Sequence, residues 1–165
     1  MIDYTVRPAE PADEATLYEM LFYAAHMNDE LGKIVNDVYQ NPALAIYAQG
    51  WGRDGDIGSI AVHNGQAVGA AWLRLFPAGA KAYSKTDDHT PELAIAVLPD
   101  YTGQGIGTAL MQHLLAAAKI RYEVVALNVR GDNPAVRLYQ RLGFEVVDTM
   151  TNRAGTESYD MRLRF

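Results

Sequence analysis

The chain has 165 residues and a mass of 18.2 kDa, with 49% hydrophobic and 21% charged residues. It is long enough for one packed domain, and this composition excludes a disordered or fibrous protein. Twenty acidic against fourteen basic residues give a net charge of −6, which argues against nucleic acid as a partner. The lack of cysteine excludes disulfides and a cysteine nucleophile and fits a cytoplasmic protein, and the lack of any apolar stretch near about 20 residues argues against a membrane span.

The first half of the chain predicts strands and helices in groups. We expect a strand over residues 2–6, a helix over 12–25, a second helical stretch over 31–48, and strands over 57–62 and 67–76. The second helical stretch should be interrupted at Asn41-Pro42, because proline disrupts a helix interior. Asn64-Gly65 lies between the last two strands and is a strong hairpin signal, because this pair suits a tight turn.

In the second half, a polar loop over residues 78–91 leads into an apolar run from Glu92 to Leu98, whose continuity predicts a strand buried on both faces. The later elements are a helix over 105–119, a strand over 122–129, a helix that Asn133-Pro134 opens and Gly143 ends, and strands over 144–147 and 157–165. The order β-α-α-β-β-β-α-β-α-β-β predicts an α/β fold with a mixed central sheet flanked by helices, in a single domain over residues 1–165.

A turn with Gly103, Gly105 and Gly107 links the buried strand to the helix after it. Glycines let the backbone approach a ligand, and a helix start presents unpaired N–H groups, so an acidic protein can hold a phosphate here. A tight turn with glycines for geometry alone is the structural alternative. A dinucleotide fingerprint is disfavoured because Leu110 stands in place of its last glycine, and a triphosphate-binding loop is disfavoured because no Gly-Lys-Ser/Thr follows.

Two segments resemble signatures of the GCN5-related N-acetyltransferase (GNAT) family. Val97-x-Pro99 followed by Thr-Gly-Gln-Gly-Ile-Gly is similar to the family's acyl-CoA-binding segment. Asn133, which leads into Ala-Val-Arg-Leu-Tyr-Gln-Arg-Leu-Gly-Phe144, is similar to its second signature. The segments come in the family's order on matching elements, and the resemblance covers most of the chain. It implies the acyl-CoA N-acyltransferase fold, with a mostly antiparallel sheet, and acetyl-CoA or coenzyme A as cosubstrate.

The resemblance also implies which residues contact the cosubstrate. They are Ile95, Ala96, Val97, Gly103, Gln104, Gly105, Ile106, Gly107, Thr108, Asn133 and Tyr139. Two positions depart from the family pattern. Thr102 stands where an Arg or Gln is usual, and Asn133 lies six residues before Tyr139 instead of seven, where Asp132 stands. We prefer Asn133 over Asp132 as the contact, because an anionic side chain beside coenzyme A would be repelled.

Acyl transfer from a thioester to an amine needs a neutral amine, donors to the oxyanion and a proton for the departing thiolate. Glu92 is the first candidate base, directly or through water; the alternatives are His89, with a reference pKa of about 6.5, and no side-chain base at all. The oxyanion donor would be a backbone N–H in Ile95–Val97, and the resemblance implies that this strand splays from the strand over 122–129. The resemblance assigns the proton for the thiolate to Tyr139, for which packing is the alternative role.

The sequence therefore predicts an N-acetyltransferase that moves an acetyl group from acetyl-CoA to a primary amine by direct transfer in a ternary complex. A route through a covalent acyl-enzyme is disfavoured, because the sequence contains neither a cysteine nor a Gly-x-Ser-x-Gly motif. A non-catalytic acyl-CoA-binding sensor and a nicotinamide-binding protein are the alternatives. Four scattered histidines predict no metal site. The acceptor would be a small-molecule or peptide amine, with loops 26–33 and 151–155 as its walls, and the resemblance allows a homodimer.

Overall fold

The structure is a computed structural model that describes residues 2–76, 87–152 and 154–165. The chain forms two compact units, Met1–Arg74 with Ala94–Ala117 and Leu75–Leu93 with Ala118–Phe165, called unit 1 and unit 2 below. None of the described helices is long and apolar enough to cross a membrane. The expectation of one domain stays a prediction, and each unit is described by itself.

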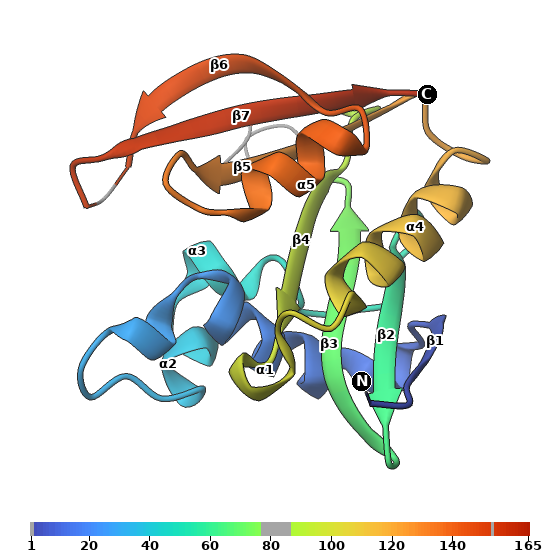
Figure 1. Cartoon of the computed structure of the whole chain (residues 1–165), viewed down its shortest axis with the longest axis vertical. Coiled ribbons are helices and arrows are strands. Elements are labelled where there is room, and N and C mark those ends of the chain that lie inside the picture. Colours follow the sequence, from blue (N-terminus) through green and yellow to red (C-terminus); the bar gives the residue numbers. More distant parts are fainter. Residues whose placement is uncertain (1, 77–86, 153) are drawn as a thin grey trace. The chain divides into compact units, whose positions relative to one another are not determined.

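The helices and strands follow the predicted order (Figure 1). The helices are α1 (Glu14–Ala24), α2 (Asn36–Tyr39), α3 (Pro42–Ala45), α4 (Ile106–Ala118) and α5 (Ala135–Arg141). The strands are β1 (Thr5–Pro8), β2 (Ile57–His63), β3 (Gln66–Arg74), β4 (Glu92–Val97), β5 (Val124–Arg130), β6 (Glu145–Thr151) and β7 (Glu157–Arg164). They hydrogen-bond in the order β1-β2-β3-β4-β5-β7-β6, with β4–β5 parallel and the pairs β1–β2, β2–β3, β5–β7 and β6–β7 antiparallel. The predicted fold class, a mixed and mostly antiparallel sheet with helices, is confirmed.

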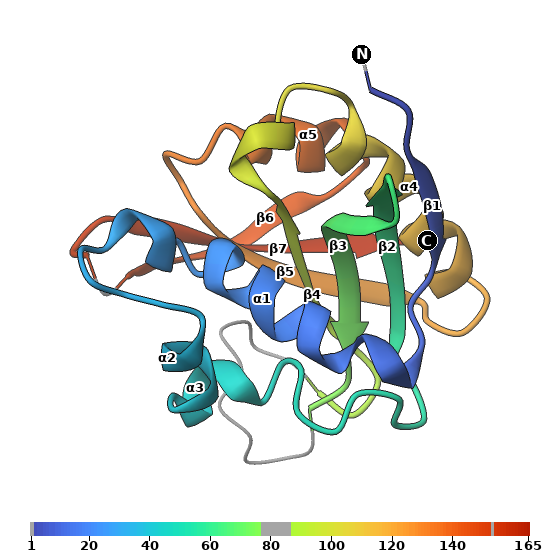
Figure 2. The same ribbon diagram turned by 90° about the horizontal axis from the view of Figure 1, so that it is seen from below.

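Unit 1 is built on the β2–β3 hairpin, which turns at Asn64-Gly65 as predicted. Both residues have positive φ, 50° and 77°, the backbone that a two-residue type I′ turn requires. Ser59 pairs with Ala71 in the register, and its hydroxyl bonds His113 of α4 at 2.6 Å, so α4 covers that face of the hairpin. Side chains alternate along a strand, so the next residues face the other way. There the Trp72 indole N–H donates to the Tyr47 carbonyl at 2.9 Å, and α1 also lies along β3 (Figure 2).

Unit 2 is built on β5, β7 and β6. Register partners share a face of the sheet, and the two faces differ in polarity. Leu127 pairs with Met161 on a buried apolar face. On the same side of β7, Leu163 lies 3.1 Å from where a side chain at Gly143 would begin, so α5 packs along it (Figure 1). Asn128 pairs with Asp160 on the opposite, polar face. Unit 2 therefore supplies polar groups on one side of its strands and a core on the other.

Predicted elements differ from the structure in extent. The first strand spans Thr5–Pro8 instead of residues 2–6, and the largest difference lies in the second helical stretch. The helical stretch over 31–48 forms only the short helices α2 and α3, and the large apolar side chains of Leu31 and Ile34 are exposed. Gly32 has a φ of +79°, a conformation that interrupts a helix. The Asp37 carboxylate accepts the Ile34 N–H at 2.8 Å, a local bond that competes with helical hydrogen bonding before α2 begins at Asn36. Residues 78–86 of the predicted polar loop lie outside the described residues, as does residue 153 of loop 151–155.

Candidate active site

The glycine turn, residues 103–107, leaves β4 through a short 3-10 helix, Pro99–Tyr101, and enters α4. Gly103 and Gly105 have φ values of 75° and 79°, in the left-handed region that favours glycine. Among the described residues, no heavy atom other than those of the glycine and its two chain neighbours lies within 4 Å of the point where a side chain at either residue would begin. The backbone of the turn is therefore open to an approaching ligand, as the sequence predicted.

The start of α4 points unpaired N–H groups toward this open backbone. Ala109 N–H donates to the Gly105 carbonyl at 3.1 Å as the first bond of the helix, so the amides of Ile106, Gly107 and Thr108 have no partner further back in the helix. The side chain of Ile106 is buried in the core, so only its amide can serve a ligand. Thr102, which replaces the usual Arg or Gln, donates its hydroxyl to the Pro99 carbonyl at 3.0 Å.

The direction of the backbone N–H groups in β4 limits which of them could serve as the predicted oxyanion donor. Among the described residues, β4 pairs with β5 only at Glu92–Ala126 and Leu93–Leu127, and the ladder then stops. Leu98 N–H donates to the Val68 carbonyl on the β3 side at 2.9 Å. Backbone N–H groups alternate along a strand, so those of Ile95 and Val97 point to the other edge and that of Ala96 points to β3. Of the three predicted donors, Ile95 and Val97 therefore direct their N–H groups away from β3, and Ala96 directs its N–H toward β3.

Glu92 is buried, with 2% of its surface exposed, so it does not face solvent at the strand end. It belongs to a register row with Ala126 of β5, Arg162 of β7 and Glu145 of β6, which places it on the polar face of unit 2. In the next row on that face, the Arg162 guanidinium binds the buried carboxylate of Asp160. The sequence analysis missed Arg162 and Asp160. The alternation of Ser158, Asp160 and Arg162 along the last strand was the signal that could have found them.

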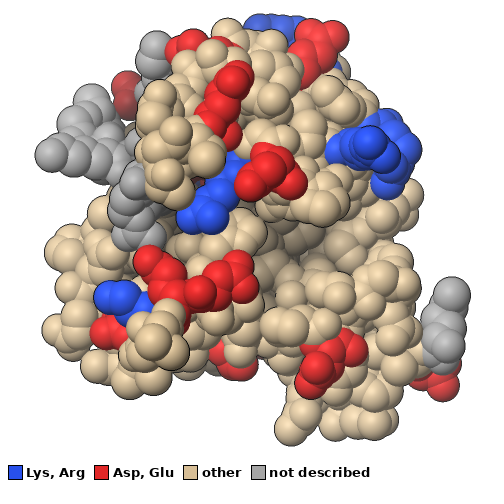
Figure 3. All heavy atoms as spheres, turned by 60° about the vertical axis from the view of Figure 1, so that its left-hand side comes forward, with Lys and Arg blue, Asp and Glu red and all other residues tan. Residues whose placement is uncertain are grey.

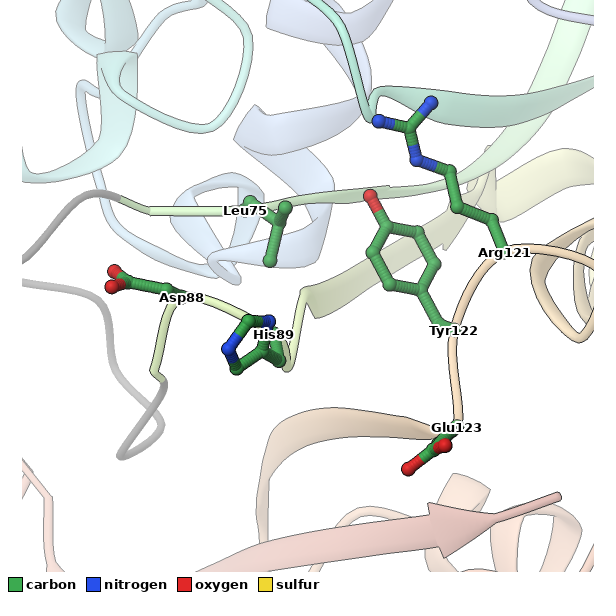
Figure 4. A pocket seen from close by; sticks show the side chains of 6 residues that line it. All are labelled: Leu75, Asp88, His89, Arg121, Tyr122 and Glu123. Carbon is green, nitrogen blue, oxygen red and sulfur yellow. The ribbon is translucent and has the colours of Figure 1, made fainter.

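His89, the alternative base, lies in an exposed loop before β4. Its backbone N–H donates to the Asp87 carboxylate at 2.8 Å, and this bond is the largest of the causes that lower the pKa of Asp87. His89 lines a pocket of about 490 Å³ in unit 2. The other lining residues are Leu75, Asp88, Arg121, Tyr122 and Glu123 (Figure 4). Figure 4 shows the rings of His89 and Tyr122 bordering one space.

Asn133 and Tyr139 mark the ends of one short stretch in unit 2. The Asn133 side-chain carbonyl accepts the Ala135 N–H at 2.9 Å, so it caps α5 as predicted, which leaves its amide N–H groups for a ligand. Tyr139 is buried, with its ring edge-on to Phe144 at 6.0 Å. Burial raises the pKa of Tyr139 to about 12. Within the described parts of the chain, no group forms a hydrogen bond with its hydroxyl.

The raised pKa of Tyr139 changes what this hydroxyl can do. Full proton transfer to a thiolate of ordinary pKa, about 8.5, would be uphill by roughly 5 kcal/mol. The hydroxyl is therefore suited to donate a hydrogen bond to a thiolate and keep its proton. This differs from the predicted transfer of the proton itself, because burial raises the pKa where a good acid would need it lowered.

The Tyr139 pKa also predicts an alkaline loss of stability. Between pH 10 and pH 12 the unfolded chain loses the phenol proton while the folded chain keeps it, so the free energy of unfolding falls by about 2 kcal/mol. Tyr139→Phe should lack this part of the loss. Urea unfolding of both proteins at pH 8, 10 and 11.5 measures it as a widening difference. Parallel curves for the two proteins would contradict the burial of the hydroxyl.

Two histidines have local partners. His113 is hydrogen-bonded to the Ser59 hydroxyl. His63 contacts the Asp3 carbonyl at 2.5 Å. Among residues 2–76, 87–152 and 154–165, no three His, Cys, Asp or Glu side chains are grouped so that they could hold a metal ion. On the face shown in Figure 3, Lys and Arg atoms stand in separate groups, often beside Asp and Glu, and not as one basic surface.

Comparison with known proteins gives matches over most of the chain. Residues 20–144 match the model of the acetyltransferase (GNAT) family. An N-alpha-acetyltransferase of Sulfurisphaera tokodaii is 48% identical over 61 residues, which are 35% of this chain and 36% of that protein. A mycothiol acetyltransferase of Saccharomonospora viridis is 37% identical over 87 residues, which are 52% of this chain and 28% of that protein. The matches thus span well under two thirds of these relatives' own length.

Solved structures share the fold over nearly the whole chain. The ribosomal-protein-alanine N-acetyltransferase from Brucella melitensis has a TM-score of 0.69 at 23% identity, covering 98% of this chain and 99% of that chain. A GCN5-related N-acetyltransferase from Kribbella flavida has a TM-score of 0.71 at 20% identity, covering 98% of both. A Salmonella typhimurium acetyltransferase structure with its cofactor acetyl-CoA has a TM-score of 0.67 at 23% identity, covering 98% and 94%. At these identities the likeness concerns the fold, and it confirms the predicted architecture.

Proposed function

Because the chain belongs to the acetyltransferase (GNAT) family, we propose that it transfers an acetyl group from acetyl-CoA to a primary amine. The observation that carries the proposal is the glycine turn, with Gly103 and Gly105 at positive φ and open space above both, leading directly into α4. Backbone N–H groups at such a helix start can bind a pyrophosphate without a basic surface. This suits a chain with a net charge of −6.

The transfer is direct, in a ternary complex, and it uses this chain's groups in three roles. The N–H of Ile95 or Val97, on the edge of β4 that faces away from β3, donates to the oxyanion that forms at the thioester carbonyl. Glu92 accepts the proton of the attacking amine, directly or through a water molecule. The Tyr139 hydroxyl donates a hydrogen bond to the departing thiolate. The amine nitrogen forms the new bond to carbon as the carbon–sulfur bond breaks.

The polar face of unit 2 supports an amine acceptor that carries further polar groups. This face carries four polar side chains, which are Glu92, Asn128, Asp160 and Arg162. Arg162 is the cation among them, so together they carry no net positive charge. The acceptor class is a small-molecule or peptide amine. Relatives named N-alpha-acetyltransferase and ribosomal-protein-alanine N-acetyltransferase favour a protein N-terminus within that class. The cytoplasm is the location we propose.

The direct test is a panel of amines screened for release of the coenzyme A thiol from acetyl-CoA. The panel should contain peptides with free N-termini, the same peptides with blocked N-termini, polyamines and free amino acids. We expect thiol release that depends on one amine class, together with an acetylated product of the matching mass. Release that no amine stimulates, in a protein that binds coenzyme A, would instead support the non-catalytic sensor.

One observation favours the alternative function, a non-catalytic acyl-CoA-binding sensor. Asn133 uses its side-chain carbonyl to cap α5 and so offers the cosubstrate only its amide N–H groups. Together with Thr102, whose hydroxyl is bonded to Pro99, this leaves fewer side-chain contacts to coenzyme A than the family pattern provides. Binding without turnover is the behaviour that separates this function from the enzyme.

Glu92→Gln should lower kcat/KM at pH 7 by about 100-fold, the lower end for a positioned general base, because the amide cannot accept the amine proton. The affinity for coenzyme A should stay nearly unchanged. Glu145→Gln is the matched control, since Glu145 is an exposed carboxylate in the same register row. Steady-state kinetics against pH should show that the acidic limb disappears in Glu92→Gln alone. Wild-type kinetics in that variant would move the base to His89 or to water.

A further inference from the structure

Residues 2–4 lie against the glycine turn, about 100 positions further along the chain. The Ile2 N–H donates to the Gln104 side-chain carbonyl at 3.1 Å. The Tyr4 hydroxyl donates to the Gly105 carbonyl at 3.4 Å. Two successive residues of the turn are thus bonded by a segment that no part of the proposed chemistry uses.

The same segment is held on its other side by the β2–β3 hairpin. His63, the last residue of β2, places Nδ1 at 2.5 Å from the Asp3 carbonyl, and the Asn64 amide lies 3.1 Å from His63 Nε2. A carbonyl only accepts, so Nδ1 carries the hydrogen, and Nε2 accepts from Asn64. Directly after this contact the chain continues as β1, with Thr5 paired to Val62. Residues 2–4 are therefore fixed to the hairpin while they bond the turn.

The Tyr4 bond acts on a peptide group that the proposed site needs. The Gly105 carbonyl accepts both the Tyr4 hydroxyl and the Ala109 N–H that opens α4. Carbonyl and N–H of one trans peptide point in opposite directions, so holding the Gly105 carbonyl aims the Ile106 N–H away from the helix. That direction is the one in which α4 presents its unpaired amides to an anion.

The two exposed glycines of the turn have no side chains to anchor them. Among the described residues, no atom beyond their chain neighbours lies within 4 Å of the points where side chains of Gly103 and Gly105 would begin, and glycine has more backbone freedom than any other residue. A turn of this kind would lose backbone entropy when it closes on a ligand. Contacts that order it before binding lower that cost and raise the affinity.

We propose that Tyr4 and Gln104 are positioning residues for acyl-CoA, which act by ordering the glycine turn for its pyrophosphate. The inference rests on the proposed function, since it concerns the same cosubstrate. On this proposal, the Gln104 side chain acts through its bond to Ile2 and not through a direct contact with phosphate. It also makes residues 2–4, which lie outside both family signatures, part of the cosubstrate site.

The test is calorimetric titration of wild type, Tyr4→Phe and Gln104→Met with coenzyme A and with pantetheine, which lacks the pyrophosphate. We expect each variant to bind coenzyme A about two- to tenfold more weakly, the range for one lost hydrogen bond, and pantetheine as wild type does. Tyr39→Phe, which removes a hydroxyl elsewhere in unit 1, is the matched control and should bind both as wild type does. Melting temperatures of all three variants should stay close to that of wild type.

Unchanged coenzyme A affinity in Tyr4→Phe would overturn the inference and leave the proposed function in place. An equal loss of coenzyme A and pantetheine affinity would also overturn it, because a general structural defect does not distinguish the two. A wild-type protein that does not bind coenzyme A would overturn the proposed function and the inference together.

Discussion

Gly105→Val is expected to lower the affinity for coenzyme A by more than about 100-fold while the protein keeps its fold. Gly105 has a φ of +79°, a conformation that costs a β-branched residue on the order of 1–3 kcal/mol. None of the described residues obstructs the new side chain, so the backbone can relieve the strain by moving locally. That movement turns away the amides of the turn, and several hydrogen bonds to a charged phosphate, each worth about 1.5–3 kcal/mol, are lost together.

The matched control for this variant is Gly32→Val. Gly32 has the same φ, +79°, and is also free of neighbours within 4 Å, but it lies in the loop before α2. Both variants should therefore lose similar amounts of stability in urea unfolding, and only Gly105→Val should lose coenzyme A binding in calorimetry. Wild-type affinity in a folded Gly105→Val protein would show that the turn does not bind the cosubstrate.

Arg74→Met is expected to destabilise the protein by about 3–5 kcal/mol. Arg74 and Asp56 form an ion pair with Nη2–Oδ2 and Nε–Oδ1 distances of 2.8 and 3.0 Å, and their side chains are only 1% and 2% exposed. Arg74 Nη1 also donates to the carbonyls of Ile46 and Gln49, at 3.0 and 2.7 Å. Removing the guanidinium takes away the cationic partner of a buried carboxylate, which keeps bonds from the Gly52 and Arg53 N–H groups, and also the donor to two carbonyls; losing one partner of a buried ion pair costs about this much.

The size of this effect comes from burial of the arginine, so an ion pair whose arginine is exposed supplies the control. Arg7 and Asp13 are also 2.8 Å apart, but the Arg7 side chain is 43% exposed. Arg7→Met should therefore cost at most about 1–2 kcal/mol in the same urea unfolding experiment. Where Arg74→Met is too unstable to purify, Asp56→Asn keeps the acceptor for the Gly52 and Arg53 N–H groups and should give a smaller, measurable loss. Equal losses in Arg7→Met and Arg74→Met would contradict the burial argument.

The parts of the site that depend on neighbouring residues could be predicted from the sequence. Glycine alone adopts positive φ at no steric cost, so Gly103 and Gly105 mark a turn wherever they occur in the fold. Asn133 caps α5 through a bond that spans two residues. By the same local chemistry, Asn64-Gly65 turns the hairpin. Each of these predictions needs only a few consecutive residues.

Predictions that depended on distant contacts were less complete. Leu31 and Ile34 are apolar but largely exposed, and the helix predicted around them does not form. Tyr139 was expected to supply a proton, and its burial instead raises its pKa to about 12. In both cases the outcome depends on whether the tertiary fold buries the side chain, and the neighbouring residues in the sequence do not determine this.

The sequence by itself therefore determined the order of the elements, the glycine turn before α4 and the family of this protein, because these follow from local backbone chemistry and from the spacing of short motifs. Only the tertiary structure decided that Glu92 is buried on a polar sheet face, that the N–H groups of Ile95 and Val97 point away from β3 while that of Ala96 points toward it, and that Tyr4 bonds the turn. Each of these depends on strand register or on contacts between residues far apart in the chain, which form only when the chain folds.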